Sequence, residues 1–237
     1  MMVTAWEADV KPFVVRIQLS SPVILGKRLA LDGLLAALLF ERTNDIDTAH
    51  QAIPLARWGS VWRGSAALIE GPAPIREVVV IQALKPQHEL SPSNLLPGRR
   101  GFPRMDVASG PFRNQMSKYI SYDTPAIWYT GCGDIPAVSG LLADVTNIGT
   151  KRTSGYGEVH SVDIEEIDFD RAGLTFVDGT PARAIPADEW ATISNLEAEM
   201  AYEPIEPPYW RSPHVLCAVP AHSIVAYAAV RRLTGVD

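Results

Sequence analysis

Two parts of the chain each show a strand pattern followed by a helix pattern, and this arrangement limits the possible folds more than any other feature. Residues 13–19 alternate in side-chain polarity with a period of two, and leucines then recur at helical spacing from Leu31 to Leu39. Residues 126–130 form a second strand pattern, and Asp134 follows as a good N-cap for a helix whose apolar face runs from Val138 to Ile148. Because each helix must bury its apolar face on another element, the pattern predicts a layered α+β domain.

Further strand signals lie between and after these two parts. Short strand pieces are expected within residues 53–69, a β-branched run occupies residues 78–81, and an outgoing strand starts at Val159 and ends near Ile167. The resulting order is strand, helix, strand, strand, long insertion, strand, helix, glycine loop and strand. This order predicts a ferredoxin-like or RNA-recognition-type core, with the helices on one face of an antiparallel sheet.

Two segments fall outside this core pattern. Residues 85–118 have little periodicity and are rich in Pro, Gly, Ser and Arg, which indicates a long loop or an inserted hairpin. After Asp170, prolines separate short apolar pieces, and one helix is expected near residues 188–200. We therefore expect a core at residues 1–170 with a basic insertion at 85–118, followed at 171–237 by a Pro-rich C-terminal extension or a degenerate second lobe. Residues 44–50 are polar and are expected to form a surface loop.

The acidic residues of the chain are concentrated in one block. The formal net charge is −6, but residues 1–157 carry 16 Lys and Arg against 13 Asp and Glu, whereas residues 158–206 carry 2 against 13. Within residues 98–118, Asp106 is accompanied by five cations, which are Arg99, Arg100, Arg104, Arg113 and Lys118. A local basic patch of this kind can bind RNA while the acidic block faces solvent or a protein partner.

Composition and spacing argue against several classes of protein. No window reaches the roughly 18 uncharged apolar residues of a membrane span. Glu7 and Asp9 precede any apolar run, unlike the order in a signal peptide, so we expect a cytoplasmic protein with no membrane partner. Cys132 and Cys217 belong to no C-x-x-C pair, and no Cys, His or carboxylate cluster indicates a metal, so neither a metal nor a cofactor is expected.

A glycine-rich loop at residues 148–159 joins the second helix to the strand that follows. Its glycines are Gly149, Gly155 and Gly157, and its other candidate contact residues are Lys151, Arg152, Thr153, Ser154 and Tyr156. Glycines allow close approach and left-handed turns, while the cations supply charge and the hydroxyls donate hydrogen bonds, a mixture suited to a phosphodiester backbone. The alternative is a helix C-cap followed by a tight turn with solvated cations, and composition does not separate the two.

Spacing excludes two better-known phosphate loops. A Walker A loop needs G-x-x-x-x-G-K-[S/T] between a strand and a helix, but here the lysine lies between the glycines and the helix precedes the strand. A dinucleotide fingerprint needs a third glycine and a following helix, and Glu158-Val159-His160 supplies neither. The loop is therefore neither of these, and a loop that holds RNA and a helix C-cap with a tight turn both stay open.

Four segments give the chain a family resemblance. The glycine loop resembles the G-loop of the CRISPR-associated RAMP superfamily, whose members are ferredoxin-like RNA-binding folds. Leu31-Asp32-Gly33-Leu34-Leu35-Ala36 is similar to a motif of several RAMP proteins of effector complexes. Similarity to the small handle-binding RAMP subunit of type IV systems lies in Ala182-Arg183-Ala184-Ile185-Pro186 and in the ending from Tyr209-Trp210 to Cys217-Ala218-Val219-Pro220.

The resemblance implies a non-catalytic, guide-RNA-binding subunit of a CRISPR ribonucleoprotein complex in antiviral defence. Such a subunit grips the 5′ repeat-derived handle of the crRNA, caps a filament of backbone RAMP subunits and contacts a large-subunit-like protein, with target DNA as an indirect partner. Carried over to this chain, the handle contacts would come from the glycine loop. The basic segment 99–118 would correspond to a thumb-like insertion that displaces a base.

Aromatic residues beside cations are further candidates for RNA contact. Arg57-Trp58 and Trp62-Arg63 interleave guanidinium groups with indole rings, and base stacking on Trp58, Trp62, Trp128 or Tyr129 is one interpretation. An aromatic side chain in a strand is more often part of the core. Arg57 and Trp58 are therefore kept as the candidate pair.

Two other functions stay open from the sequence. A metal-independent RAMP endoribonuclease that processes pre-crRNA would need a general base and a general acid, and His50, after the first helix, is the best-placed histidine. The other alternative is a protein-interaction module in which the glycine loop is only a turn.

Overall fold

Strand β1 (Val10–Leu19) alternates in sequence because it lies between two packed layers. Phe13, Val15 and Ile17 are fully buried in one core, whereas Val14 belongs to a second core that contains Trp128. These features come from a computed structural model of the chain, which describes residues 10–26, 29–82, 95–96, 104–105, 113–221 and 223–236.

A five-stranded sheet of order β10-β1-β9-β4-β14 contains β1. Strands β9 (Ala126–Asp134) and β10 (Val159–Glu166) run antiparallel to β1, and β4 (Leu68–Gly71) runs antiparallel to β9. Strand β14 (Ile224–Ala226) instead runs parallel to β4. The sheet is therefore mixed, and the prediction of a purely antiparallel sheet is wrong at this one edge, because a C-terminal strand pairs with the outer side of β4.

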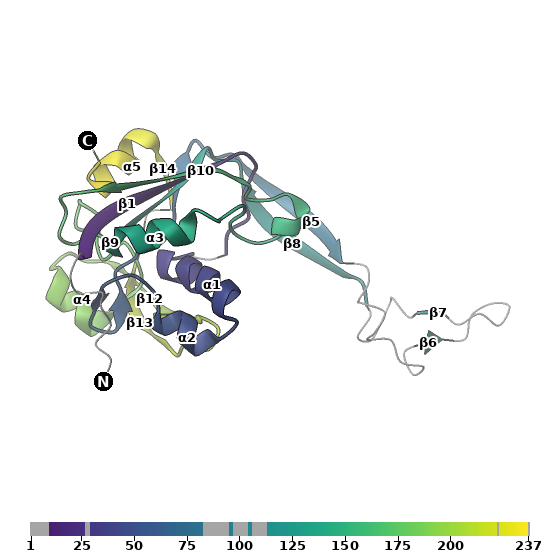
Figure 1. Ribbon diagram of the computed structural model, residues 1–237, viewed down its shortest axis with the longest axis horizontal. Coiled ribbons are helices and arrows are strands. Elements are labelled where there is room, and N and C mark those ends of the chain that lie inside the picture. The colour runs from purple at the N-terminus through teal and green to yellow at the C-terminus, as the bar shows by residue number, and fades with distance from the viewer. Residues whose placement is uncertain are drawn as a thin grey trace. The chain divides into compact units, whose positions relative to one another are not determined.

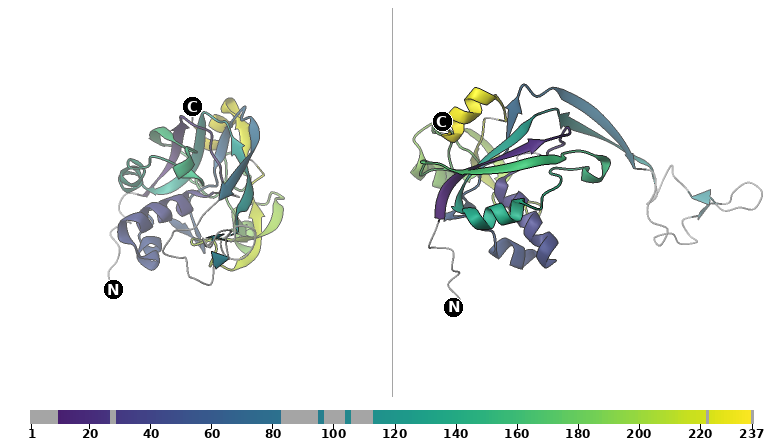
Figure 2. Two further views of the ribbon diagram at one scale, coloured as in Figure 1. Left: turned by 90° about the vertical axis from the view of Figure 1, so that its right-hand side faces the viewer. Right: turned by 45° about the horizontal axis from the view of Figure 1, so that its top comes forward.

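Helices cover both faces of this sheet. Figure 1 and Figure 2 show α1 (Leu31–Thr43) and α3 (Ile135–Leu142) on one face and α5 (Tyr227–Thr234) on the other. Leucines of α1 and Val138 of α3 share the core with the inner residues of β1 and β9. Val230 and Leu233 of α5 are buried in the second core with Val14 and Trp128. The prediction of an α+β domain is confirmed, but the expectation that helices lie on one face of the sheet only is wrong, because α5 buries Val230 and Leu233 against the other face.

The starts of the helices follow the sequence more closely than their ends. Asp134 Oδ1 accepts a hydrogen bond from the Ala137 N–H at 2.9 Å, which confirms the predicted N-cap of α3. Helix α3 ends at Leu142, although Val145 and Ile148 continue its apolar face and are buried beyond it. The predicted loop at residues 44–50 is wrong: α2 (Ile46–Gln51) forms there, because the Asp45 side chain caps it through the Thr48 N–H at 2.6 Å.

The C-terminal part of the chain builds a second, smaller sheet. Its order is β11-β13-β12, formed by β11 (Ile185–Pro186), β12 (Glu199–Pro204) and β13 (His214–Val219). Helix α4 (Ala187–Ile193) joins it through a core that contains Trp190 and Val61. Val61 comes from a short hairpin of β2 (Arg57–Trp58) and β3 (Val61–Trp62), within the stretch for which strand pieces are predicted.

The chain divides into two compact units. One comprises residues 1–74 with 122–237 and contains both sheets described above, so both sides of the expected boundary near Asp170 lie within it. The other comprises residues 75–121. In it, β5 (Ile75–Gln82) pairs with β8 (Gln115–Tyr122), and β6 (Leu95–Leu96) pairs with β7 (Arg104–Met105).

Within the described ranges, no helix has the length and apolar character needed to cross a membrane.

Candidate nucleic-acid interface

The glycine loop (residues 148–159) is tied at both ends to the segment between β1 and α1. The Thr150 N–H donates to the carbonyl oxygen of Ile24 at 2.8 Å, and the Gly157 N–H donates to the carbonyl oxygen of Pro22 at 2.8 Å. The Ile148 N–H donates to the carbonyl oxygen of Gly157, also at 2.8 Å, and closes the base of the loop. The loop therefore has a fixed base, with residues 151–156 between its anchors.

The surroundings of the three loop glycines differ. Gly149 and Gly157 have φ angles of 80° and 67°, and a Cβ atom at either position would overlap a backbone carbonyl oxygen, that of Ile24 or of Ile148. Gly155 has a φ angle of 82°, but among the described residues no heavy atom beyond its chain neighbours lies within 4 Å of the place where its Cβ would be. Packing inside the protein thus accounts for Gly149 and Gly157, whereas Gly155 presents open backbone to solvent.

The part of the loop farthest from its anchors is one short turn. The 3-10 helix η5 (Arg152–Ser154) follows Lys151, which has a left-handed φ of 60°, and the Ser154 N–H donates to the Lys151 carbonyl oxygen at 2.9 Å. Arg152, Thr153, Ser154 and Gly155 are exposed. One guanidinium and two hydroxyl groups are therefore accessible beside the open glycine.

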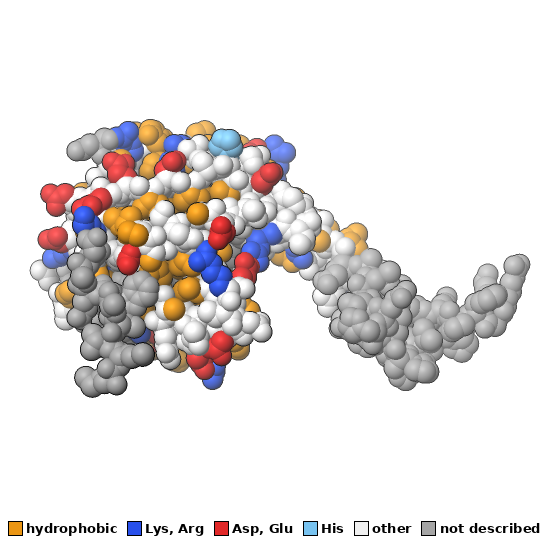
Figure 3. All heavy atoms as spheres, in the orientation of Figure 1, with side chains coloured by type: hydrophobic (Ala, Val, Ile, Leu, Met, Phe, Trp, Pro, Cys, Tyr) orange, Lys and Arg blue, Asp and Glu red, His pale blue; other side chains and the backbone are white. Residues whose placement is uncertain are grey.

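Arg152 forms an ion pair across the surface with α1. Its Nη1 lies 3.2 Å from Glu41 Oε1, and both side chains are about half exposed. An exposed pair of this kind contributes only about 0–1 kcal/mol, so a phosphate group can replace Glu41 at small cost. Figure 3 shows Lys and Arg side chains interspersed with Asp and Glu on the face in view, without a broad basic patch among the described residues of that face.

Arg57 and Trp58 lie next to each other in β2. The guanidinium carbon of Arg57 lies 4.6 Å from the centroid of the Trp62 ring, and its Nη2 is 2.9 Å from Glu206 Oε2. Trp58 is 45% exposed. Of the pair, Trp58 is therefore available for stacking, while the charge of Arg57 is already matched by a carboxylate.

The base-stacking interpretation is wrong for the aromatic residues of β9. Trp128 is 4% exposed and Tyr129 is fully buried, because β9 is an inner strand with packed layers on both faces. The Trp128 indole N–H donates to Glu70 Oε2 at 2.8 Å, so this ring is a core residue with its polar atom satisfied.

The predicted basic segment belongs to the unit of residues 75–121, whereas the glycine loop belongs to the other unit. Arg99 and Arg100 lie outside the described residues, and Arg104 is placed only as part of strand β7. Arg113 is exposed, and Lys118 in β8 forms a 2.9 Å ion pair with Glu77 of β5. The charge of Lys118 is thus balanced by a carboxylate on the strand with which β8 pairs.

His50 lies in an apolar groove of about 370 Å³, here called the α1–α2 groove. The groove is lined by Gly33, Ala36, Ala37, Phe40, Ile46, His50, Pro207, Pro208, Tyr209 and Trp210. The other ionisable group in this lining is the Tyr209 hydroxyl, which donates to Asp32 Oδ1 at 2.6 Å. RNA cleavage by acid–base catalysis needs two groups in reach of the substrate, and this lining offers His50 no free second group.

A buried ionic network brings together the motifs that carry the family resemblance outside the loop. Arg183 Nη1 lies 3.2 Å from Asp32 Oδ2, and these side chains are 2% and 0% exposed. Tyr209 completes the network through its hydrogen bond to the other oxygen of Asp32. The guanidinium also donates to the carbonyl oxygens of Trp62, Gly64 and Ile205.

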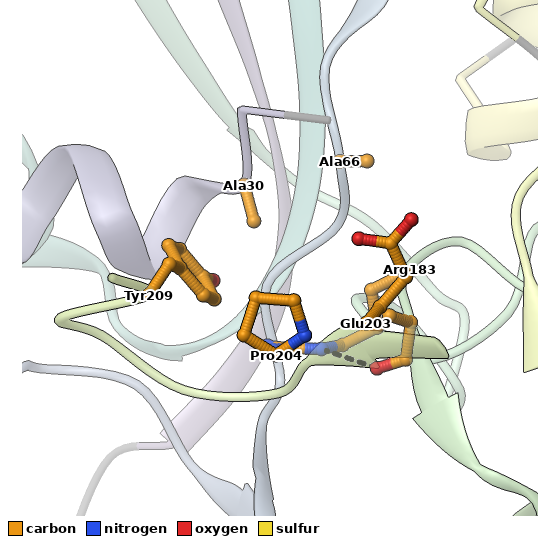
Figure 4. Close-up of a pocket in the computed structure, with 7 residues that line it drawn as sticks. Ala30, Ala66, Arg183, Glu203, Pro204 and Tyr209 are labelled. Atoms are coloured by element: carbon orange, nitrogen blue, oxygen red, sulfur yellow. Dashed lines mark hydrogen bonds between the residues drawn. The ribbon is translucent and has the colours of Figure 1, made fainter. Parts of the chain in front are cut away.

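The network keeps Arg183 charged and Tyr209 neutral inside the protein. Burial opposes the charge on Arg183, but the Asp32 carboxylate raises its pKa above the ordinary value, so the guanidinium stays protonated. Burial, followed by the Asp32 charge, raises the pKa of Tyr209 well above the ordinary value, so its hydroxyl remains a donor. Figure 4 shows Arg183 and Tyr209 beside a small cavity of about 100 Å³. Arg183 is therefore a structural cation.

These motifs lie far apart in the sequence, and no pattern along the chain shows that they meet. Asp32 stands in a leucine-rich helix, and an acid in such a context is the one local signal of a buried partner. The next residue, Gly33, has no side chain, and a Cβ atom at this position would lie only 2.8 Å from Cε2 of the Tyr209 ring. Asp32 and Gly33 thus allow the N-terminal end of α1 to pack against residues 207–210.

Comparisons with known proteins give one family match. A family model described as "CRISPR type IV associated protein Csf3" matches residues 80–221. No curated protein sequence matches the chain. Among solved structures, the chain is similar to one in the cryo-EM structure of the Type III-B Cmr-beta bound to cognate target RNA, at 9% identity and a TM-score of 0.36. That similarity covers 66% of this chain and 61% of the other, so it spans about three fifths of that chain, and such a TM-score does not establish a shared fold.

Proposed function

The chain belongs to the Csf3 family of CRISPR type IV associated proteins, and from this premise we propose that it is a non-catalytic, guide-RNA-binding subunit that grips the 5′ repeat-derived handle of the crRNA. The matched residues include the whole glycine loop. At the level of family, the resemblance predicted from the sequence is confirmed. The same proposal includes backbone RAMP subunits and a large-subunit-like protein as neighbours in the effector complex, with target DNA reached indirectly.

A ferredoxin-like core, the fold of RAMP proteins, is part of the proposal. In chain order β1, α1, β4, β9, α3 and β10 give strand, helix, strand, strand, helix and strand. Their sheet order, β10-β1-β9-β4, places the last strand beside the first and the third beside both the first and the second. This connectivity supports the ferredoxin-like assignment, in which the glycine loop connects the second helix to the last strand.

The open backbone at Gly155 is the observation that most strongly supports RNA binding by the glycine loop. Phosphate contacts in nucleic-acid complexes come from Arg and Lys, from hydroxyl groups and from backbone N–H groups that can be approached closely. Arg152, Thr153 and Ser154 offer the first two kinds of group on an exposed turn, and Gly155 adds a stretch of main chain without a side chain. The anchored base of the loop holds these groups in place before RNA binds.

Removing the two adjacent cations tests the grip. In the double variant Lys151→Ala/Arg152→Ala, we expect handle-RNA affinity to fall about tenfold and the slope of log K against log salt to become shallower by about 1.4, since each charge contributes about 0.7 for single strands. Fluorescence anisotropy with labelled handle RNA at several salt concentrations measures both values.

A charge-matched control is Lys11→Ala/Arg232→Ala, which removes two cations outside the loop and should leave affinity within twofold of the wild type. Glu41→Gln releases Arg152 from its carboxylate partner and should tighten binding. Equal affinity and an equal salt slope for the loop variant and the wild type would refute the grip.

The alternative, a metal-independent endoribonuclease that processes pre-crRNA, is tested with the same protein. It predicts site-specific cleavage of repeat RNA in the presence of EDTA, with activity lost in His50→Ala. Such cleavage would replace the non-catalytic proposal, whereas intact RNA with retained binding agrees with it.

A further inference from the structure

The α1–α2 groove shares no residue with the glycine loop and has a regular construction. Gly33, Ala36, Ala37 and Phe40 follow helical spacing, so one face of α1 forms its floor. Ile46 and His50 come from one face of α2, and residues 207–210 form the opposite side. A groove of about 370 Å³ is large enough to receive an apolar side chain from another molecule.

The groove exposes large apolar side chains at its edge. Trp210 is 79% exposed and Phe40 is 40% exposed, whereas Leu31 and Leu35 on the opposite side of α1 are fully buried. Exposed aromatic residues beside a groove are typical of binding sites, and tryptophan is among the residues that contribute most to interfaces between proteins. The outer face of α1 therefore offers an exposed apolar surface beside the groove.

One side of the groove is held in place by the buried network. The Tyr209 hydroxyl is fixed on Asp32 at 2.6 Å, and the absence of a side chain at Gly33 lets the Tyr209 ring lie against α1. Pro207 and Pro208 restrict the backbone before it. A groove that exists before binding loses little conformational entropy when it is filled.

The charges near the groove favour a basic protein partner over RNA. Asp45 and Asp47 flank Ile46 and are exposed, and hydrogen bonds from Thr48 lower the pKa of Asp45, so it is ionised at neutral pH. On the other side, Arg211 follows Trp210. The acidic charge beside α2 repels phosphate groups and attracts Lys or Arg.

We propose that the α1–α2 groove docks an apolar side chain, flanked by Lys or Arg, from a neighbouring protein subunit of the effector complex. Phe40 and Trp210 enclose the apolar side chain, and Asp45 and Asp47 face the basic flank. The inference rests on membership in a multisubunit complex and is independent of the RNA contacts proposed for the glycine loop.

Ala37→Glu tests the docking, because Ala37 is an exposed groove residue outside the core. The full chain is co-expressed with the other subunits of its complex and the guide RNA, and its amount is measured after purification through a tag on another subunit. We expect at least a tenfold loss of this subunit for Ala37→Glu. Ala228→Glu, at an exposed position of α5, should assemble within twofold of the wild type. Asp47→Lys should weaken assembly several-fold.

Isolated proteins distinguish this inference from the RNA grip. Ala37→Glu should bind handle RNA with wild-type affinity, whereas the loop variant should lose affinity. If Ala37→Glu does not fold, as judged by circular dichroism, Trp210→Ser removes the exposed ring and replaces it in every arm. Normal assembly of the groove variant overturns the inference. A loss of RNA affinity would identify RNA as the occupant, and dimerisation of the wild type that Ala37→Glu abolishes would identify a second copy; either result also overturns it.

Discussion

Tyr129 and Tyr209 are both buried tyrosines, but their hydroxyl groups are in opposite situations. Tyr129, in β9, is fully buried and its hydroxyl has no hydrogen-bond partner among the described residues. Burial also raises its pKa above the ordinary value, so it stays neutral. The Tyr209 hydroxyl instead donates to the Asp32 carboxylate at 2.6 Å. The first hydroxyl costs stability and the second provides it.

The same substitution should therefore have opposite effects at the two positions. Tyr129→Phe removes an unsatisfied buried hydroxyl and should raise the free energy of unfolding by about 1 kcal/mol. Tyr209→Phe removes a hydrogen bond to a charged group and should lower it by about 1.5–3 kcal/mol. Urea denaturation of both variants measures the difference, and changes of the same sign would contradict the assignment of the two hydroxyls.

At the scale of elements, two of the ion pairs that connect α1 to its surroundings differ in kind. Arg183 and Asp32, at the N-terminal end of the helix, are 3.2 Å apart and buried. Arg42, near its C-terminal end, is 2.8 Å from Asp144, but the side chains are 47% and 78% exposed. The shorter pair is screened by water, so burial rather than distance decides how much each pair matters.

Removing the arginine from each pair checks this difference. Arg183→Met leaves the Asp32 carboxylate buried without its cation and should lower the free energy of unfolding by about 3–5 kcal/mol. Arg42→Met should change it by less than about 1 kcal/mol. Thermal and urea unfolding of the two variants give the comparison, and similar losses in both would show that the buried network is not important for stability.

The elements also show where local reasoning works. Asp134 is predictable as a cap because its hydrogen bond reaches only to Ala137. Helix α2 is missed because six residues are too few for an apolar period to be recognised. The β5–β8 pairing is not evident from the sequence because its strands, at residues 75–82 and 115–122, are separated by a long stretch of chain. Strand pairing over such a distance leaves no local pattern.

On the scale of the whole molecule, the two segments of the larger unit that flank residues 75–121 in sequence lie next to each other. The Asp123 N–H donates to the carbonyl oxygen of Pro74 at 3.0 Å, and Tyr122 exchanges backbone hydrogen bonds with Val23 at 2.8 and 2.9 Å. The chain on either side of residues 75–121 is therefore held together by contacts inside the larger unit. We therefore expect that the larger unit can fold without the pairing of β5 with β8.

Deleting residues 75–121 should leave the larger unit folded. With Pro74 and Tyr122 joined by a short Gly-Ser linker, we expect a cooperative melt with a Tm within about 5 °C of the full chain, the size of shift that about 1 kcal/mol produces. Circular dichroism melting checks this. Removal of α5 is the contrasting deletion, since it takes buried Val230 and Leu233 out of the core and should prevent folding. Loss of cooperative unfolding in the variant that lacks residues 75–121 would contradict the division into units.

The sequence by itself determined the features that depend on residues within a few positions of one another. These are the alternation of β1, the leucine face and start of α1, the Asp134 cap, the glycines of the loop and the motifs of the family resemblance. Propensity, capping and turn conformation act over a few residues, so their patterns can be recognised along the chain.

Only the tertiary structure decided which of these features meet. Asp32 and Arg183 are 151 positions apart, and their pairing requires the C-terminal part of the chain to return to the start of α1. The same return places Trp210 beside α1 and α2 and forms the groove, while packing on both faces of the sheet buries Trp128. Contacts between distant residues depend on how whole elements pack, and a periodic pattern in one segment carries no information about the partner it will bury against.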